Sequence, residues 1–130
     1  MQTKSIRQSA TFSVKPSEVY ETLMDSRKHA AFSGAKANIS RNVGGKFTAY
    51  DDYIEGKNVK LISNKKIVQE WRGKDWPKGH YSKVTFTLKA VKGGTRLSFY
   101  QSGVPAKDYK GIKSGWISFY WQPMKKVLNK

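Results

Sequence analysis

The stretch DYKGIKSGWISFYWQPMKKVL, residues 108–128, decides the fold because its apolar residues recur at helical spacing. The two apolar rows are Ile112, Trp116, Tyr120, Pro123 and Val127, and then Ile117, Trp121, Met124 and Leu128. The polar residues between the rows form a narrow stripe, which predicts a helix with a wide apolar face. At about 1.5 Å per residue such a helix is roughly 31 Å long, enough to lie across a whole sheet.

Three residues inside this helix have special backbone properties. Gly111 and Gly115 predict that the first turns pack closely against a neighbour. Pro123 lacks a backbone N–H, so it predicts a kink or a missing hydrogen bond.

The chain before the helix alternates with the period of a strand. Residues 83–90 are the clearest case, with Val84, Phe86, Leu88 and Ala90 facing one way and polar residues facing the other. Further strands are predicted at residues 6–14, 37–40, 46–50, 53–63, 66–72 and 95–101. Residues 92–95 predict a hairpin between the last two strands.

Two short helices are predicted directly after the first strand. Pro16 suits the first position of one helix, and Asp25 and Ser26 can cap another that runs to about Phe32. The elements together predict an α+β helix-grip fold in which a curved antiparallel sheet wraps around a long C-terminal helix. We expect residues 1–130 to form a single domain of this kind.

A short turn lies within WRGKDWPKGHY, residues 71–81. Pro77 restricts its own φ angle and Gly79 can adopt a positive one, so residues 75–79 should close a hairpin with Trp76 at its tip. Two alternatives follow for Trp76. Its ring either folds back onto its own sheet or stays exposed as an anchor for a partner.

The chain carries a formal charge of +16, and the charge is uneven. Residues 1–55 hold eight Lys/Arg against six Asp/Glu, whereas residues 56–130 hold seventeen against three. This pattern suits a diffuse Lys-rich surface, an acidic protein partner, nucleic acid or an anionic membrane surface. Lysines outnumber arginines, which favours steering of a partner over bidentate recognition of phosphates or bases.

Several function classes are disfavoured by composition. The chain has no cysteine, which excludes disulfides, thiolate nucleophiles and cysteine-based zinc sites, and which agrees with a cytoplasmic location. The polar N-terminal residues predict neither a signal peptide nor a membrane span. No RNP, KH or helix-turn-helix pattern organises the basic and aromatic residues, so nucleic-acid binding is disfavoured.

Catalytic and metal-binding groups are sparse. His29 and His80 have no metal-ligating partner at short spacing, so each predicts a hydrogen-bonded structural role. Asp51 and Asp52 are adjacent and predict a turn, because neighbouring side chains in a strand point to opposite faces. We therefore expect no enzyme activity, no metal and no cofactor.

Six short motifs resemble one family in order and spacing. They are GGKF (44–47), IVQEWR (67–72), WPKGH (76–80), GTRL (94–97), SGVP (102–105) and GWISFYW (115–121). Together they are similar to the carboxy-terminal domain of the activators of heat shock protein 90 ATPase, and the similarity extends from about residue 12 to residue 128. The broader helix-grip, START-like superfamily often lacks the WPKGH turn.

The resemblance implies a co-chaperone module that engages the nucleotide-binding domains of the heat shock protein 90 dimer. The family's amino-terminal domain carries a Trp-His-Trp motif that these 130 residues do not contain, so stimulation of ATP hydrolysis by these residues alone stays open. The candidate partner-binding residues are Lys74, Trp76, Lys78 and His80.

The alternative function is a stand-alone carrier of a small hydrophobic ligand or lipid in a cavity under the long helix. The candidate lining residues are Trp71, Phe86, Phe99, Trp116 and Tyr120. So many large rings can also fill the space themselves, which favours the chaperone interpretation.

Overall fold

The computed structural model describes residues 2–129. Seven antiparallel strands form one sheet in the order β1-β7-β6-β5-β4-β3-β2. The strands are β1 (Thr3–Phe12), β2 (Asn38–Ile39), β3 (Lys46–Ala49), β4 (Ile54–Ile62), β5 (Lys66–Gly73), β6 (Ser82–Val91) and β7 (Gly94–Pro105). The helices are α1 (Pro16–Met24), α2 (Ser26–Ser33), η1 (Ala106–Asp108), α3 (Tyr109–Trp116), η2 (Ile117–Trp121) and α4 (Gln122–Leu128).

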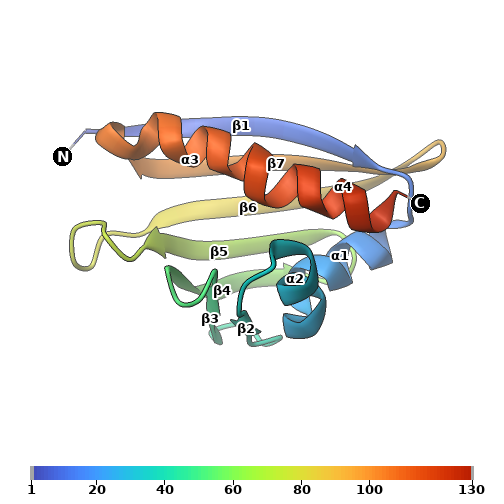
Figure 1. The fold of residues 1–130 in the computed structure, drawn as a ribbon, viewed down its shortest axis with the longest axis horizontal. Coiled ribbons are helices and arrows are strands. Elements are labelled where there is room, and N and C mark those ends of the chain that lie inside the picture. The colour runs from blue at the N-terminus through green and yellow to red at the C-terminus, as the bar shows by residue number, and fades with distance from the viewer. Residues whose placement is uncertain (1, 130) are drawn as a thin grey trace.

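The predicted helix-grip arrangement is confirmed. Figure 1 shows the long helix, α3 to α4, lying across one face of the curved sheet, with α1 and α2 on that same face near the end of α4. None of the helices within residues 2–129 is long and apolar enough to cross a lipid bilayer.

The hairpin of β6 and β7 follows the predicted alternation. Val84, Phe86 and Leu88 are buried, and Val91 pairs with Gly94 across a two-residue turn in which Gly93 has a φ of 83°. A positive φ at the second central residue is the conformation of a type II turn, which favours glycine at that position. Ala90, expected on the inner face, is exposed because it lies at the end of the ladder beyond the reach of the helices.

The two short helices begin as their sequences predict. Pro16 is the first residue of α1, and the Asp25 carboxylate accepts a hydrogen bond of 3.0 Å from the Lys28 N–H at the start of α2. Gly34, with a φ of 71°, ends α2. The turn predicted at Asp51 and Asp52 is also present.

The long helix is continuous from residue 109 to residue 128, but its middle is a π-helical turn. The Gln122 N–H reaches back five residues to the carbonyl of Ile117. Pro123 has no N–H for the carbonyl of Phe119, and the Tyr50 hydroxyl donates to that carbonyl instead. The helix therefore lacks one internal hydrogen bond at Pro123, as predicted, and the Tyr50 hydroxyl supplies the replacement from outside the helix.

The π-helical turn changes which residues face the sheet. Trp116, Tyr120, Trp121 and Met124 are buried as predicted, but Ile117 and Val127 are 42% and 41% exposed. The expectation that both belong to the apolar rows was wrong, because rows drawn at α-helical spacing lose their register where an extra residue widens a turn.

Two glutamines fasten the helix to the sheet. The Trp116 indole N–H donates to Gln101 Oε1 on β7 at 2.8 Å, and the Trp121 indole N–H donates to Gln8 Oε1 on β1 at 2.6 Å. Gln101 also donates to the Ser82 hydroxyl at 2.9 Å, and Ser82 donates to the Trp71 carbonyl at 2.7 Å. Because each indole donor has a partner, both rings can be buried without an unpaired polar group.

Candidate functional site

The turn between β5 and β6 holds the residues expected to bind a partner, and its central ring is buried. Trp76 is only 4% exposed, and its ring lies 5.5 Å from that of Trp71 and 5.9 Å from that of His80. Of the two alternatives for Trp76, an exposed anchor for a partner was therefore wrong, because the ring folds back onto its own sheet. Pro77 and the positive φ of Gly79 (78°) reverse the chain as predicted.

Two side chains hold this turn rigidly. Arg72 donates to the Trp76 carbonyl at 2.6 Å and to Glu55 Oε1 at 3.1 Å. His80 Nε2 lies 2.8 Å from the carbonyl of Gly103 on β7. His29 is likewise bonded through Nδ1 to the Leu23 carbonyl at 3.2 Å, so both histidines have the hydrogen-bonded role expected of them.

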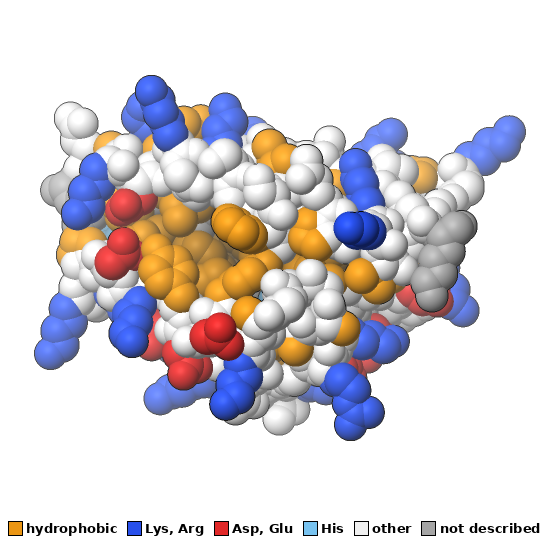
Figure 2. Space-filling view, viewed as in Figure 1, with side chains coloured by type: hydrophobic (Ala, Val, Ile, Leu, Met, Phe, Trp, Pro, Cys, Tyr) orange, Lys and Arg blue, Asp and Glu red, His pale blue; other side chains and the backbone are white. Residues whose placement is uncertain are grey.

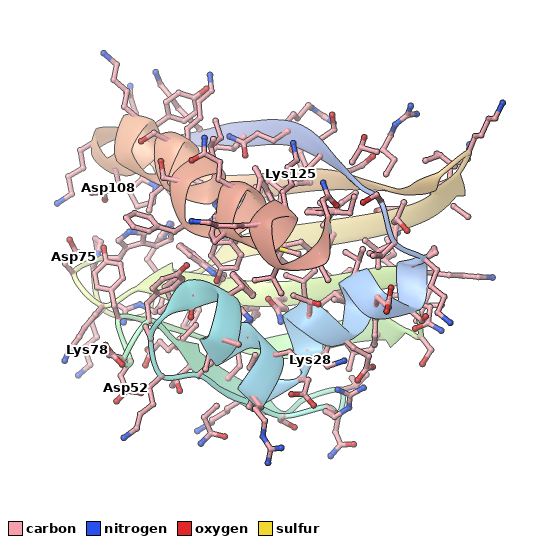
Figure 3. The ribbon with its side chains drawn as sticks, turned by 45° about the vertical axis from the view of Figure 1, so that its right-hand side comes forward. Lys28, Asp52, Asp75, Lys78, Asp108 and Lys125 are labelled. Atoms are coloured by element: carbon pink, nitrogen blue, oxygen red, sulfur yellow. The ribbon has the colours of Figure 1, made fainter. Side chains whose placement is uncertain are left out.

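The lysines of the turn point into solvent. Lys74 and Lys78 are exposed, and neither forms an ion pair with any residue in the described part of the chain. Figure 3 shows Lys78 at one end of the molecule, far from Lys125 on α4. The turn is thus a rigid basic tip, which we define as Lys74, Lys78 and the buried Trp76 beneath them.

The space enclosed by helix and sheet is filled by rings. Trp116 lies 4.3 Å from Phe99 and 4.3 Å from Tyr120, measured between ring centroids, and Phe86 lies 5.5 Å from Phe99. The enclosed cavity bordered by Trp71, Phe86, Trp116 and Tyr120 has a volume of about 10 Å³. That volume suits no more than a single water molecule.

An open groove lies beside this filled core, between α3 and the loop that joins β3 to β4. Its volume is about 510 Å³, in the range of small-molecule sites. It is visible in Figure 2 as an apolar hollow with acidic atoms at its edge. Three of the five expected cavity residues line the groove, namely Trp71, Trp116 and Tyr120. The other two, Phe86 and Phe99, lie in the core. The other lining residues are Tyr50, Tyr53, Ile54, Lys107, Asp108, Gly111, Ile112, Gly115 and Phe119.

The two glycines of α3 line this groove and do not serve close packing. A Cβ added at Gly111 would meet no atom within 4 Å, and one added at Gly115 would be in ordinary contact with Phe119 at 3.7 Å. The expectation that they let the helix pack closely was wrong. Glycine in a helix costs about 1 kcal/mol relative to alanine. Gly111 and Gly115 therefore lower the stability of α3 and at the same time leave the groove open.

Acidic side chains stand at the mouth of the groove. The Tyr53 hydroxyl donates to Asp75 Oδ1 at 2.8 Å. Burial of Tyr53, that hydrogen bond and the negative charges of Asp75 and Asp108 raise the pKa of the tyrosine to about 12. Asp108 precedes α3 but makes no capping hydrogen bond, so its carboxylate is available at the groove.

The loop opposite α3 is conformationally strained and tied to the helix. Tyr50, Asp51 and Asp52 have φ angles of 52°, 55° and 73°, which residues other than glycine rarely adopt. The ring of Tyr50 lies 5.8 Å from that of Phe119, whose carbonyl receives the Tyr50 hydroxyl. Burial raises the pKa of Tyr50 to about 12, so the hydroxyl stays protonated as a donor.

No group of three or more His, Asp or Glu side chains converges as a metal site within residues 2–129. The sequence interpretation placed partner binding at the basic tip and a ligand in an enclosed cavity under the helix. Three of the five cavity candidates line the groove, but the open side of the groove at Gly111 and Gly115 was not predicted. The signal that the sequence offered was this pair of glycines, four residues apart on one helix face.

Comparisons with known proteins agree with this architecture. The sequence model of the family described as "Activator of Hsp90 ATPase homolog 1-like protein" matches residues 13–129. Human "Activator of 90 kDa heat shock protein ATPase homolog 1" is 32% identical over 118 residues, which cover 91% of this chain and 35% of that protein. The Dictyostelium discoideum "Activator of 90 kDa heat shock protein ATPase homolog" is 32% identical over 115 residues, covering 88% and 30%.

Among solved structures, the crystal structure of an HSP90 activator from Plasmodium falciparum matches with a TM-score of 0.89 and 26% identity. The match covers 95% of this chain and 94% of that one. The chain spans about a third of the length of the two curated relatives named above.

Proposed function

Because the chain belongs to the family of activator of Hsp90 ATPase homolog 1-like proteins, we propose that it is a co-chaperone module that docks on a heat shock protein 90 chaperone. The observation that carries this proposal is the match over residues 13–129, which includes nearly every element of the fold. The relatives are named as activators of that chaperone's ATPase, which supports a binding role for this chain. We propose that it acts in the cytoplasm.

The charge of the chain supports an acidic partner. A formal charge of +16 on 130 residues repels other copies of the chain and attracts acidic surfaces. Such attraction raises the rate of association more than it lowers the rate of dissociation, and it weakens as salt is added.

We place the docking surface at the basic tip. Lys74 and Lys78 are exposed, free of ion pairs within residues 2–129, and held by a turn that Arg72 and His80 brace. Such a turn loses little conformational freedom on binding, which favours affinity. Trp76 contributes by supporting the turn from below, since its ring is buried.

Surface plasmon resonance against a purified heat shock protein 90 chaperone tests the proposal. The Lys74→Glu/Lys78→Glu double variant should associate about tenfold more slowly at low salt, and the difference should shrink as salt increases. The matched control is Lys125→Glu/Lys126→Glu, which makes the same change of charge on α4, away from the tip (Figure 3).

Equal slowing by both double variants would show that only net charge matters and would refute the tip as the docking surface. Absence of binding by the unaltered chain at micromolar concentration would refute the chaperone proposal itself. A direct ATPase measurement with the same chaperone then determines whether these residues alone stimulate hydrolysis.

The alternative of a ligand carrier with an enclosed cavity is the weaker candidate. The cavity beneath the helix holds about 10 Å³, too little for a lipid chain. A ligand would have to enter the open groove beside α3.

A further inference from the structure

The groove between α3 and the β3–β4 loop combines an apolar floor with an acidic mouth. We propose that it binds an organic cation with an apolar body, whose ammonium group lies between Asp75 and Asp108 and whose body lies against Trp71 and Trp116. The proposal concerns a small ligand and does not depend on docking to a chaperone.

Two glycines keep the groove open. Gly111 and Gly115 both line it, and larger side chains would fit at either position without displacing backbone. A Leu or Met at Gly111 would fill the groove and favour the helix as well. Nothing in the packing of residues 2–129 explains these glycines, whereas a ligand that occupies the groove does.

Two unpaired carboxylates lie near the groove in an otherwise basic part of the chain. Residues 56–130 contain only three acidic side chains, Glu70, Asp75 and Asp108. Glu70 pairs with Lys57 at 3.7 Å, whereas Asp75 and Asp108 form no ion pair with a described residue. Asp108 lines the groove, and Asp75 lies next to its mouth, where it accepts a hydrogen bond from the hydroxyl of the lining residue Tyr53. Figure 3 shows both carboxylates at the same end of the molecule.

Aromatic side chains line much of the groove. Six of the lining residues carry aromatic rings: Tyr50, Tyr53, Trp71, Trp116, Phe119 and Tyr120. Aromatic faces attract ammonium groups and also pack against an apolar body. Three lysines oppose a cation: Lys107 at the rim, and Lys74 and Lys78 of the basic tip, which lie in the same turn as Asp75. All three side chains are exposed and free to turn into solvent.

A matched ligand series tests the sign of the charge. 4-Phenylbutylamine, 4-phenylbutanol and 5-phenylpentanoate share one phenylbutyl body and carry a positive, a zero and a negative charge at neutral pH. Titration of each into the full chain, followed by NMR of the Trp indole N–H signals, gives the three affinities. We expect the amine to bind about fivefold more tightly than the alcohol, and the carboxylate to bind most weakly.

The net charge of +16 alone predicts the opposite order. The carboxylate binding as tightly as the amine, or tighter, would therefore overturn the proposal. So would the absence of saturable binding by all three ligands up to their solubility limits.

Variants locate the site and separate its two parts. Asp75→Asn and Asp108→Asn should each lower amine affinity by about two- to fivefold and leave the alcohol unchanged. Lys107→Gln should raise amine affinity, and Glu70→Gln, on the outer face of the sheet, is the matched control that should change nothing. An equal loss with Glu70→Gln would refute the assignment of the cation to the groove mouth.

Gly111→Leu should abolish binding of the amine and the alcohol, while Gly111→Ala should retain it. A melting temperature at or above that of the unaltered chain shows that Gly111→Leu is folded. Unchanged binding by a folded Gly111→Leu variant would place the ligand elsewhere and overturn the proposal.

Discussion

The contact between Trp116 and Gln101 offers a quantitative test of how the long helix is held. The indole N–H donates to Gln101 Oε1 at 2.8 Å, and Trp116 is 2% exposed, so neither group can turn to water when the other is removed. Gln101→Met leaves a buried indole donor without a partner, which costs about 2 kcal/mol of the free energy of unfolding. Trp116→Phe leaves the amide oxygen unpaired and adds a small void, for a loss of about 2 to 3 kcal/mol.

The double variant should be less destabilised than the sum of the single variants. When both partners are removed, neither an indole donor nor an amide oxygen is left unpaired, and the lost bond from Gln101 to Ser82 is common to the Gln101→Met and double variants, so the two losses should overlap by about 1 to 2 kcal/mol. Urea unfolding followed by circular dichroism measures all four proteins, provided that the slope m stays constant. The control pairs Trp116→Phe with Gln8→Met, because Gln8 accepts from Trp121 and not from Trp116.

Additivity of Trp116→Phe and Gln101→Met within about 0.3 to 0.5 kcal/mol would refute the reasoning. It would mean that the hydrogen bond adds nothing beyond the packing of the two side chains. A coupling of the same size in the control pair would also count against it, because the effect would then be a general response of the core.

Three further predictions concern single positions. Trp76→Ala should lower the free energy of unfolding by about 3 kcal/mol in urea titration, because the ring is 4% exposed; a loss under about 1 kcal/mol would contradict its burial. Burial lowers the pKa of His29 to about 4, so the unfolded chain binds a proton that the fold does not between about pH 6.5 and pH 4. Stability should therefore fall by about 3 kcal/mol as pH drops through that window, and His29→Gln should flatten the profile while His80→Gln should not. Gly111→Ala should raise the free energy of unfolding by up to about 1 kcal/mol, and a decrease would show that a neighbour needs the space.

Local periodicity predicted most of the architecture. The alternation of Val84, Phe86 and Leu88 and the helical spacing of Trp116, Tyr120 and Met124 each depend on one element and its burial, so they can be derived from neighbouring residues alone. The hairpin turns were predictable for the same reason, since Gly79 and Gly93 act through their own backbone angles.

The errors arose where a distant residue decides the outcome. Trp76 is buried because its ring packs against the rings of Trp71 and His80, and turn chemistry alone does not reveal those contacts. Ile117 turns outward because a π-helical turn follows, next to the carbonyl that Tyr50 satisfies from a different loop. Three of the expected cavity residues line the groove, but its position on the open side of α3 was not predicted, because an empty space leaves no period in the sequence.

The replacement of the Pro123 hydrogen bond by Tyr50 has an evolutionary consequence. A proline at position 123 leaves the Phe119 carbonyl without a helical N–H, and the Tyr50 hydroxyl supplies a donor, whereas a residue with an N–H at 123 can restore the bond within the helix. Loss of Tyr50 should therefore cost more stability while Pro123 is present than after the proline has been replaced. Across related sequences, proline at position 123 should occur with phenylalanine at position 50 less often than the frequencies of the two residues alone predict.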